Sequence, residues 1–313
     1  MPHALFSRRL IFVIGKGGVG RTTVAQALAI AAATRGMRTL VADLEPGEID
    51  DPAEPPQTST SYIPSTREGP ADGTTTVISG VEQLSIDPQA AMEEYLTLKL
   101  PGSAAALLRH SRLFGAFALA TPGMREMLCM GKLWELAQLQ RRTPQAAPYD
   151  LVIVDAPASG HGVALLRTPR TFAGLTRVGP IADQAQRIAA TLTDPAFTAV
   201  VSVCTPQELA VNETLMVRDA LSCAPGPMDL QAVILNGIHP DRFTEAEVSE
   251  LEPDAGDPSV ALALIAARRA AMERAQEARL ADAFADRLLR LPYLFRELLD
   301  VSDLQLLATA LSP

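Results

Sequence analysis

"LIFVIGKGGVGRTTVAQALAIAAATRG" occupies residues 10–36 and joins three kinds of sequence. The run at 10–15 is continuously apolar, which predicts a parallel strand buried on both of its faces. The segment from Thr22 to about Arg35 is rich in alanine and is expected to form a helix that ends at Gly36. A glycine-rich loop lies between them, and a strand, a glycine loop and a helix in this order predict a phosphate-binding loop in an α/β fold.

Residues 15–22 match the pattern G-x-x-x-x-G-K-[ST], except that Arg21 takes the place of the lysine. Glycines let backbone N–H groups converge on phosphate oxygens, and the positive end of the following helix points at the same anion. Thr22 brings a hydroxyl that suits Mg²⁺. A glycine turn that merely joins strand to helix is the alternative interpretation. The predicted nucleotide-binding residues of this loop are Gly15, Lys16, Gly17, Gly18, Val19, Gly20, Arg21, Thr22 and Thr23.

Arg21 keeps the positive charge of the missing lysine and can bind phosphate through two nitrogens. Its planar head is bulkier than an ammonium group. We therefore expect nucleotide binding to persist, whereas the alignment of the transition state for hydrolysis is impaired or depends on a partner.

Further apolar runs alternate with helical patterns along the chain of 313 residues. Strands are expected near residues 38–43, 81–88, 149–155, 197–206, 231–238 and 289–294, and a long helix over about 258–288. This alternation predicts a single domain with a doubly wound, mostly parallel sheet. Residues 89–142 have helical patterns throughout, which predicts an inserted helical subdomain. Residues 46–76 contain six prolines and few core residues, so a flexible loop is expected there.

The net charge of −9 argues against non-specific binding to nucleic acid or to an anionic membrane surface. The three cysteines form no CxxC pair and are too widely spaced to predict a disulfide framework or a thiol metalloid site. The first residues lack the features of a signal peptide, and no apolar run reaches the ~18 residues of a membrane span. We therefore expect a soluble, cytoplasmic protein with no integral membrane segment.

The segment "LVIVD" at 151–155 is a second apolar run, and it ends in a carboxylate, Asp155. Because the carboxyl ends of parallel strands share one edge of a sheet, Asp155 is expected beside the phosphate loop, where it would hold Mg²⁺ through water. An aspartate that only caps the next helix is the alternative.

Several segments now point to one family. "DAPASGHGVALLRTP" at 155–169 resembles the switch II segment of the ArsA family, which contains arsenite-pump ATPases and ATPases that target tail-anchored membrane proteins. The "KGGVG" of the loop is similar to the deviant phosphate loop of the SIMIBI class of P-loop NTPases, to which that family belongs. Segments at 86–96, 121–136 and 205–214 also resemble the family, so the match covers most of the chain outside 46–76. The chain is identified as a divergent, single-half member.

The resemblance implies binding of ATP or ADP with Mg²⁺. It implies that Lys16 reaches across a dimer to the partner's nucleotide and that Thr22 and Asp155 hold the metal. Asn236 would bind adenine through its amide, and the segment "LPYLF" at 291–295, with Pro292 and Tyr293, would line the base pocket.

A switch I carboxylate that orients the attacking water is also implied. Glu45 falls at the family's position for it, and Asp43 is the second candidate. A literal Asp-Pro-Ala occurs only at 51–53, inside the proline-rich segment. Two departures at the chemical centre, Arg21 and this carboxylate, weaken the case for fast hydrolysis.

In the family, the helical block forms the groove that binds a protein client. Met124, Met127 and Met130 recur three residues apart there, which fits either such a groove or, our preferred interpretation, the core of the block itself. The long helix carries charges of both signs and is expected to be solvated. His110 and His239 have no partner pattern, and no role is predicted for them.

The leading hypothesis is an ATPase that acts as a nucleotide-driven switch, as a homodimer or as a heterodimer with a related subunit, and that controls a protein client. The first alternative is a nucleotide-binding regulatory subunit with little activity, paired with a catalytic paralogue. The second is a positioning ATPase like ParA or MinD, against which the helical insert and the lack of a basic C-terminal membrane helix argue.

Overall fold

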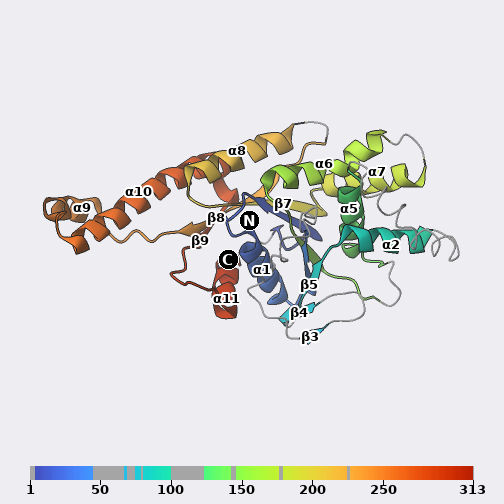
Figure 1. Ribbon diagram of the computed structural model, residues 1–313, viewed down its shortest axis with the longest axis horizontal. Helices are drawn as coiled ribbons and strands as arrows, with labels where there is room; N and C mark the ends of the chain where they lie inside the picture. The colour runs from blue at the N-terminus through green and yellow to red at the C-terminus, as the bar shows by residue number, and fades with distance from the viewer. Residues whose placement is uncertain are drawn as a thin grey trace, which may run out of the picture.

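A nine-stranded sheet forms the centre of the molecule in the computed structural model (Figure 1). The structure describes residues 4–44, 67–68, 75–78, 80–99, 123–141, 146–175, 179–223 and 226–312. The strands are β1 (Leu10–Gly15), β2 (Thr39–Asp43), β3 (Arg67–Glu68), β4 (Thr75–Ile78), β5 (Val81–Ser85), β6 (Leu151–Asp155), β7 (Thr198–Cys204), β8 (Leu230–Ile238) and β9 (Leu288–Pro292).

The strand order is β3-β4-β5-β2-β6-β1-β7-β8-β9, and the seven strands from β5 to β9 in that order are parallel. β1 lies between β6 and β7, and all six of its residues are buried, as its unbroken apolar sequence predicts. The predicted fold class, a doubly wound and mostly parallel sheet, is confirmed.

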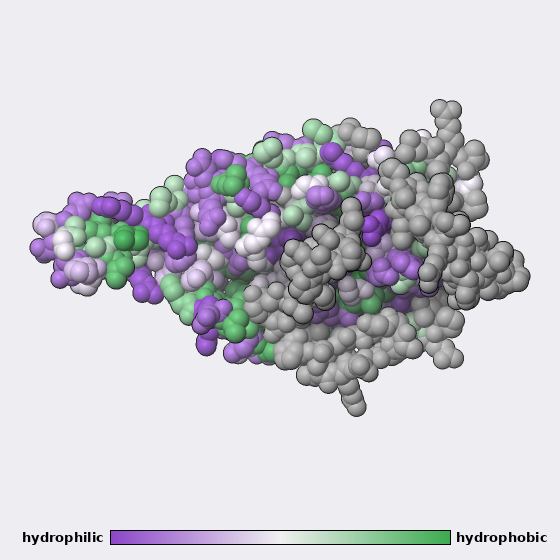
Figure 2. Space-filling view, viewed as in Figure 1, coloured by the Kyte–Doolittle hydropathy of each residue, from purple (hydrophilic) through white to green (hydrophobic). Residues whose placement is uncertain are grey.

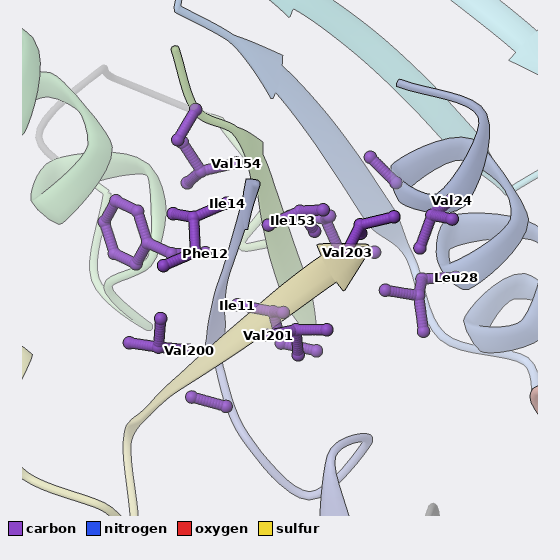
Figure 3. Packing of buried hydrophobic residues seen from close by; sticks show 14 of the residues in the cluster. Ile11, Phe12, Ile14, Val24, Leu28, Ile153, Val154, Val200, Val201 and Val203 are labelled. Carbon is purple, nitrogen blue, oxygen red and sulfur yellow. The ribbon is translucent and has the colours of Figure 1, made fainter. Parts of the chain in front are cut away.

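Helices cover both faces of this sheet. On one face lie α1 (Arg21–Ala33) and α11 (Val301–Ala310), and on the other α6 (Ser159–Leu175) and α8 (Glu208–Ser222). Side chains of β1 alternate between the two helical layers (Figure 3). Phe12 and Ile14 point to one face of the sheet. Ile11 points to the other face, where Val24 and Leu28 of α1 pack. The sheet thereby positions the loop between β1 and α1.

A second group of helices stacks beyond α6, at the right of Figure 1. It comprises α2 (Pro88–Lys99), α5 (Met124–Leu136) and α7 (Pro180–Thr193), and α5 contacts α2, α6 and α7. α2 and α5 fall within the predicted helical subdomain at 89–142, of which residues 100–122 and 142–145 lie outside the described residues.

A helical arm projects from the opposite end of the molecule (Figure 1). α10 (Pro258–Phe284) packs through its C-terminal part against α8, β8 and β9, and α9 (Glu245–Leu251) and the 3₁₀ helix η2 (Glu252–Asp254) fold back on its N-terminal part. A second 3₁₀ helix, η3 (Ala285–Arg287), leads from α10 into β9.

Two short antiparallel strands, β3 and β4, were not predicted. β3 and the first residues of β4 fall within the predicted loop at 46–76, where a run of threonines favours extended backbone next to β5. Residues 45–66 lie outside the described residues, so flexibility of that segment stays a prediction. No helix in the described ranges is both long and apolar enough to cross a membrane.

Candidate functional site

The loop between β1 and α1 turns sharply on its glycines. Gly15, Gly18 and Gly20 have φ angles of 155°, 80° and 88°. A Cβ at Gly15 would lie 2.3 Å from the backbone oxygen of Val203 in β7, so the strand end admits glycine alone. A Cβ at Gly17 or Gly18 would meet nothing within 4 Å. These two backbones therefore border open space, as a cradle for phosphate requires.

The first turn of α1 is tied to the end of β6. The Thr22 hydroxyl donates a hydrogen bond of 2.5 Å to Oδ2 of Asp155, and Nη1 of Arg21 donates to the backbone carbonyl of Ala156. The structure thus brings together the three side chains that the sequence placed at the phosphate loop and the strand end. Thr23, the next predicted contact, is buried within α1.

Asp155 is a buried carboxylate of which one oxygen accepts a hydrogen bond and the other accepts none from the described residues. Burial raises its pKa, while the Thr22 hydrogen bond and the charge of Arg21 act in the opposite direction. Its Oδ1 atom has no hydrogen-bond partner among the described residues. A free carboxylate oxygen beside a threonine hydroxyl is a hard oxygen donor set, so the residues present fit Mg²⁺.

The second predicted carboxylate lies on the neighbouring strand. Asp43 ends β2 and is paired in register with Asp155 of β6 and with Ser85 of β5. The two carboxylates therefore come from adjacent strands at the same edge of the sheet. Glu45, the other switch I candidate, lies outside the described residues.

A cleft of about 580 Å³, open to solvent, adjoins the glycine loop. Its walls include Gly18, Val19 and Gly20 of the loop, residues 205–207 after β7, Asn236 and Gly237 of β8, and Tyr293. Asn236 Nδ2 donates a hydrogen bond of 2.9 Å to the backbone oxygen of Val19. The predicted base-binding residues Asn236 and Tyr293 thus share one cleft with the loop, and Pro292 ends β9 immediately before Tyr293.

His239, for which the sequence predicted no role, contacts two side chains that line this cleft, Tyr293 and Glu273. Its ring stacks on Tyr293 with a centroid distance of 4.3 Å and an interplanar angle of 18°. Its Nδ1 lies 2.9 Å from Oε1 of Glu273, and its backbone N–H donates to Oε2 of the same carboxylate at 2.9 Å. The fold supplies this partner from a distant helix, and no sequence pattern around His239 indicated it.

Glu273 is a buried exception among the charged residues of the long helix, which the sequence predicts to be solvated. Its carboxylate is buried, accepts a hydrogen bond of 3.1 Å from Nε of Arg269, and lines the cleft together with that arginine. From the sequence, the Arg269–Glu273 spacing reads as an ordinary i,i+4 surface pair. No local signal connects it to a histidine 34 residues earlier.

Comparison with known proteins decides the family. The sequence profile of the anion-transporting ATPases, ArsA, matches residues 8–181, which is more than half of the chain. The chain belongs to the ArsA ATPase family. The family predicted from the loop and from the segment at 155–169 is therefore confirmed, and the protein is an ATP-binding ATPase.

Similar proteins come from several bacteria. The ATPase BagA of Mycobacterium tuberculosis is 29% identical over 266 residues, which cover 81% of this chain and 73% of BagA. An arsenical pump-driving ATPase of Escherichia coli is 27% identical over 255 residues, which cover 74% of this chain and 39% of that protein. A protein of the same name from Acidiphilium multivorum is 26% identical over 260 residues, with 75% and 40% covered.

The thiols of this ArsA-family chain lie apart from one another. Cys129 is buried in α5, Cys204 is buried at the end of β7, and Cys223 is exposed after α8. Burial raises the pKa of Cys129 to about 12 and that of Cys204 to about 11, so both thiols are protonated at neutral pH. Within the described ranges, no three His, Cys, Asp or Glu side chains are grouped to hold a metal ion.

The methionines of α5 pack mainly into the core, the preferred interpretation. Met127 and Met130 are both buried in the core and Met124 packs against it, while Met124 and Met127 also line a cavity, open to solvent, between α2, α5 and α7. The same cavity is bordered by Lys132, whose ammonium lies 2.6 Å from Oε2 of Glu94. Most of its remaining lining is apolar.

Proposed function

We propose that this ArsA-family ATPase is a nucleotide-driven dimer switch that binds ATP with Mg²⁺ at the glycine loop. The observation that carries the proposal is the unpartnered Oδ1 of Asp155 beside the Thr22 hydroxyl, directly behind a loop whose glycines border open space. Mg²⁺, when bound, would neutralise charge on the phosphates and polarise the bond that breaks. Thr22 and Asp155 would hold it, Asp155 through water.

The residues of the loop have separate proposed roles. Backbone N–H groups from Gly15 to Thr22 would surround the phosphates, and Arg21 would turn its remaining guanidinium N–H groups toward them. Lys16 is only half buried and has no ion-pair partner in the part of the chain that the structure describes. It would reach the nucleotide of a second subunit, which makes turnover depend on pairing.

A carboxylate on a neighbouring strand would orient the attacking water. Asp43 is supported by its register beside Asp155, and Glu45 remains the alternative. At the other end of the nucleotide, Asn236 would give up its hydrogen bond to the Val19 carbonyl and form hydrogen bonds with the edge of the adenine. Tyr293 would stack against the base.

The helical group would carry the client site of this switch. The cavity between α2, α5 and α7 offers adaptable methionines and a neighbouring ion pair, Lys132 with Glu94. An apolar segment of a protein client fits such a lining. Because α5 packs on α6, which follows Asp155 in the chain, movement at the metal site has a direct route to this cavity.

Arg21 supports a second candidate, a regulatory subunit with little activity of its own. Its Nη1 is engaged by the carbonyl of Ala156 and not free for phosphate. If nucleotide does not displace this contact, Arg21 cannot stabilise the transferring phosphoryl group. Such a chain would bind nucleotide and rely on a catalytic paralogue.

The active switch and the regulatory subunit can be separated by measuring steady-state hydrolysis of Mg-ATP. The native chain is compared with Arg21→Lys and with Asp155→Asn. A dimer switch with its own activity predicts turnover that Asp155→Asn reduces at least 100-fold. Tight ATP binding without turnover would reject the first candidate. Activity gained in Arg21→Lys would then assign the defect to Arg21, and no gain would place it at switch I or at a missing partner.

A further inference from the structure

One arginine of α10 lines the nucleotide cleft and has N–H groups that nothing in the described chain engages. Arg269 borders this cleft together with residues 18–20 of the glycine loop. Its Nε donates a hydrogen bond of 3.1 Å to Oε1 of Glu273, and neither of its two Nη atoms has a hydrogen-bond partner among the described residues. The side chain is 53% exposed, so these N–H groups are open to a ligand.

The polar side chains of the cleft make it attractive to an anion. Arg269 is the one basic side chain among the described residues that line it, and Glu273 is the one acidic side chain. The Glu273 carboxylate is 8% exposed and is already bonded to Arg269, to the ring of His239 and to the backbone N–H of His239. It therefore shows a ligand little negative charge, whereas Arg269 shows its positive charge directly.

Glu273 also fixes the guanidinium of Arg269 in place. A guanidinium group carries five N–H donors in a planar fork, so it can bind one anion through Nε and a second through its two Nη groups. Arg269 and Glu273 are four residues apart on α10, and the carboxylate is the buried partner. Because Nε is held, Arg269 loses less conformational freedom when a ligand binds.

A phosphate chain needs such a cation in this protein. The net charge of −9 repels a polyphosphate, so cations close to it are needed to offset that repulsion. At the loop itself, Nη1 of Arg21 is bonded to the carbonyl of Ala156. Figure 2 shows hydrophilic, purple side chains on the arm where α10 meets the body, so this surface is solvated.

We propose that Arg269 is a phosphate-binding residue of this ATPase. Its two Nη groups donate hydrogen bonds to the phosphate chain of a nucleotide that is seated on the glycine loop, while Glu273 holds its Nε. The phosphates are favoured over the base and the ribose, because a hydrogen bond between two charged groups is about twice as strong as one between neutral groups. The inference rests on the nucleotide site of the proposed function and adds a contact from α10 to it.

Calorimetry of the full chain with inorganic tripolyphosphate and Mg²⁺ tests the contact. Arg269→Ala is expected to raise the dissociation constant of tripolyphosphate at least tenfold. Arg268→Ala is the matched control, because Arg268 is the preceding residue of α10, is also exposed, and is not part of the described cleft lining. The control is expected to bind tripolyphosphate as the native chain does. Equal affinities of the two variants would overturn the proposal.

Arg269→Lys separates the forked geometry from the charge. An ammonium group can pair with Glu273, so the buried carboxylate keeps a cationic partner and the fold is retained, which urea unfolding verifies. A single ammonium cannot hold Glu273 and a phosphate as the planar fork does. The dissociation constant of tripolyphosphate is therefore expected to rise at least threefold in this variant. A lysine variant that binds as tightly as the native chain would overturn the arrangement.

ADP distinguishes a phosphate contact from a contact with the base or the ribose. Arg269→Ala is expected to weaken ADP and tripolyphosphate alike. Weakening of ADP alone would place Arg269 at the nucleoside and overturn the phosphate contact. A native chain that binds neither ligand would reject the nucleotide site of the proposed function, whereas a native chain that binds both, with no effect of Arg269→Ala, would reject the role of Arg269 alone.

Discussion

Removal of the imidazole of His239 tests whether its contact with Glu273 prepares the proposed base end of the nucleotide cleft. The ring stacks on Tyr293 at 4.3 Å and is held by Glu273. Such a stacked pair contributes about 0.5–1.5 kcal/mol beyond its buried area. If Tyr293 in turn stacks on the base, His239→Ala transmits part of this loss to nucleotide binding. Since 1.4 kcal/mol is a factor of ten, the dissociation constant of ADP is expected to rise measurably, by up to about 12-fold.

Calorimetry with two ligands isolates this effect. In the proposed site, ADP and inorganic tripolyphosphate would both use the glycine loop, but only ADP would reach Tyr293. His239→Ala is therefore expected to weaken ADP and to leave tripolyphosphate unchanged. The variant keeps the backbone N–H that donates to Glu273, so its unfolding free energy is expected to fall by only about 1 kcal/mol. Equal weakening of both ligands, or of neither, would refute the reasoning.

Three further outcomes follow from the site. Asp155→Asn is expected to stabilise the ligand-free protein at pH 7, because burial raises the pKa of this carboxyl and its charge is costly once formed. The gain should shrink as the pH falls through the raised pKa, as urea titrations at a series of pH values would show. In the same assay Gly20→Ala is expected to lower the free energy of unfolding by about 2–3 kcal/mol, since the φ of Gly20 is 88° and the new Cβ would lie 2.4 Å from Nδ2 of Asn236. Gly17→Ala is expected to lower it by less than about 0.5 kcal/mol, because a Cβ at Gly17 meets nothing within 4 Å. Under native conditions a thiol reagent should modify Cys223 rapidly and the two buried cysteines slowly, because burial raises the pKa of those two thiols to about 12 and about 11.

The parallel strands and the phosphate loop could be predicted because their determinants are local. A buried strand reads as an unbroken apolar run, and the loop as closely spaced glycines, whatever surrounds them. The position of Asp155 beside the phosphate loop could also be predicted, since the carboxyl ends of parallel strands share one edge of the sheet.

The cleft wall opposite the loop could not be predicted from such patterns. His239 and Glu273 are joined only by the packing of α10 on β8, and neither has a local partner pattern that names the other. The strands β3 and β4 were missed because two to four residues give too short an alternation to recognise. Glu45 was chosen by its position after β2, and that choice is still a prediction.

The close packing of α1 against α11 has a consequence for biosynthesis. α1 is buried on nearly all sides, and its outer cover, including the bond of 2.7 Å from Arg35 to Ser312, is made some 270 residues later in the chain. At about 5–20 residues per second, the ribosome needs roughly 15–55 seconds to supply it. During that interval an alanine- and leucine-rich helix directly behind the glycine loop lacks its partner. The nascent chain should therefore acquire nucleotide only once α11 has left the ribosome, and a pulse-labelled chain should engage holdase chaperones until then.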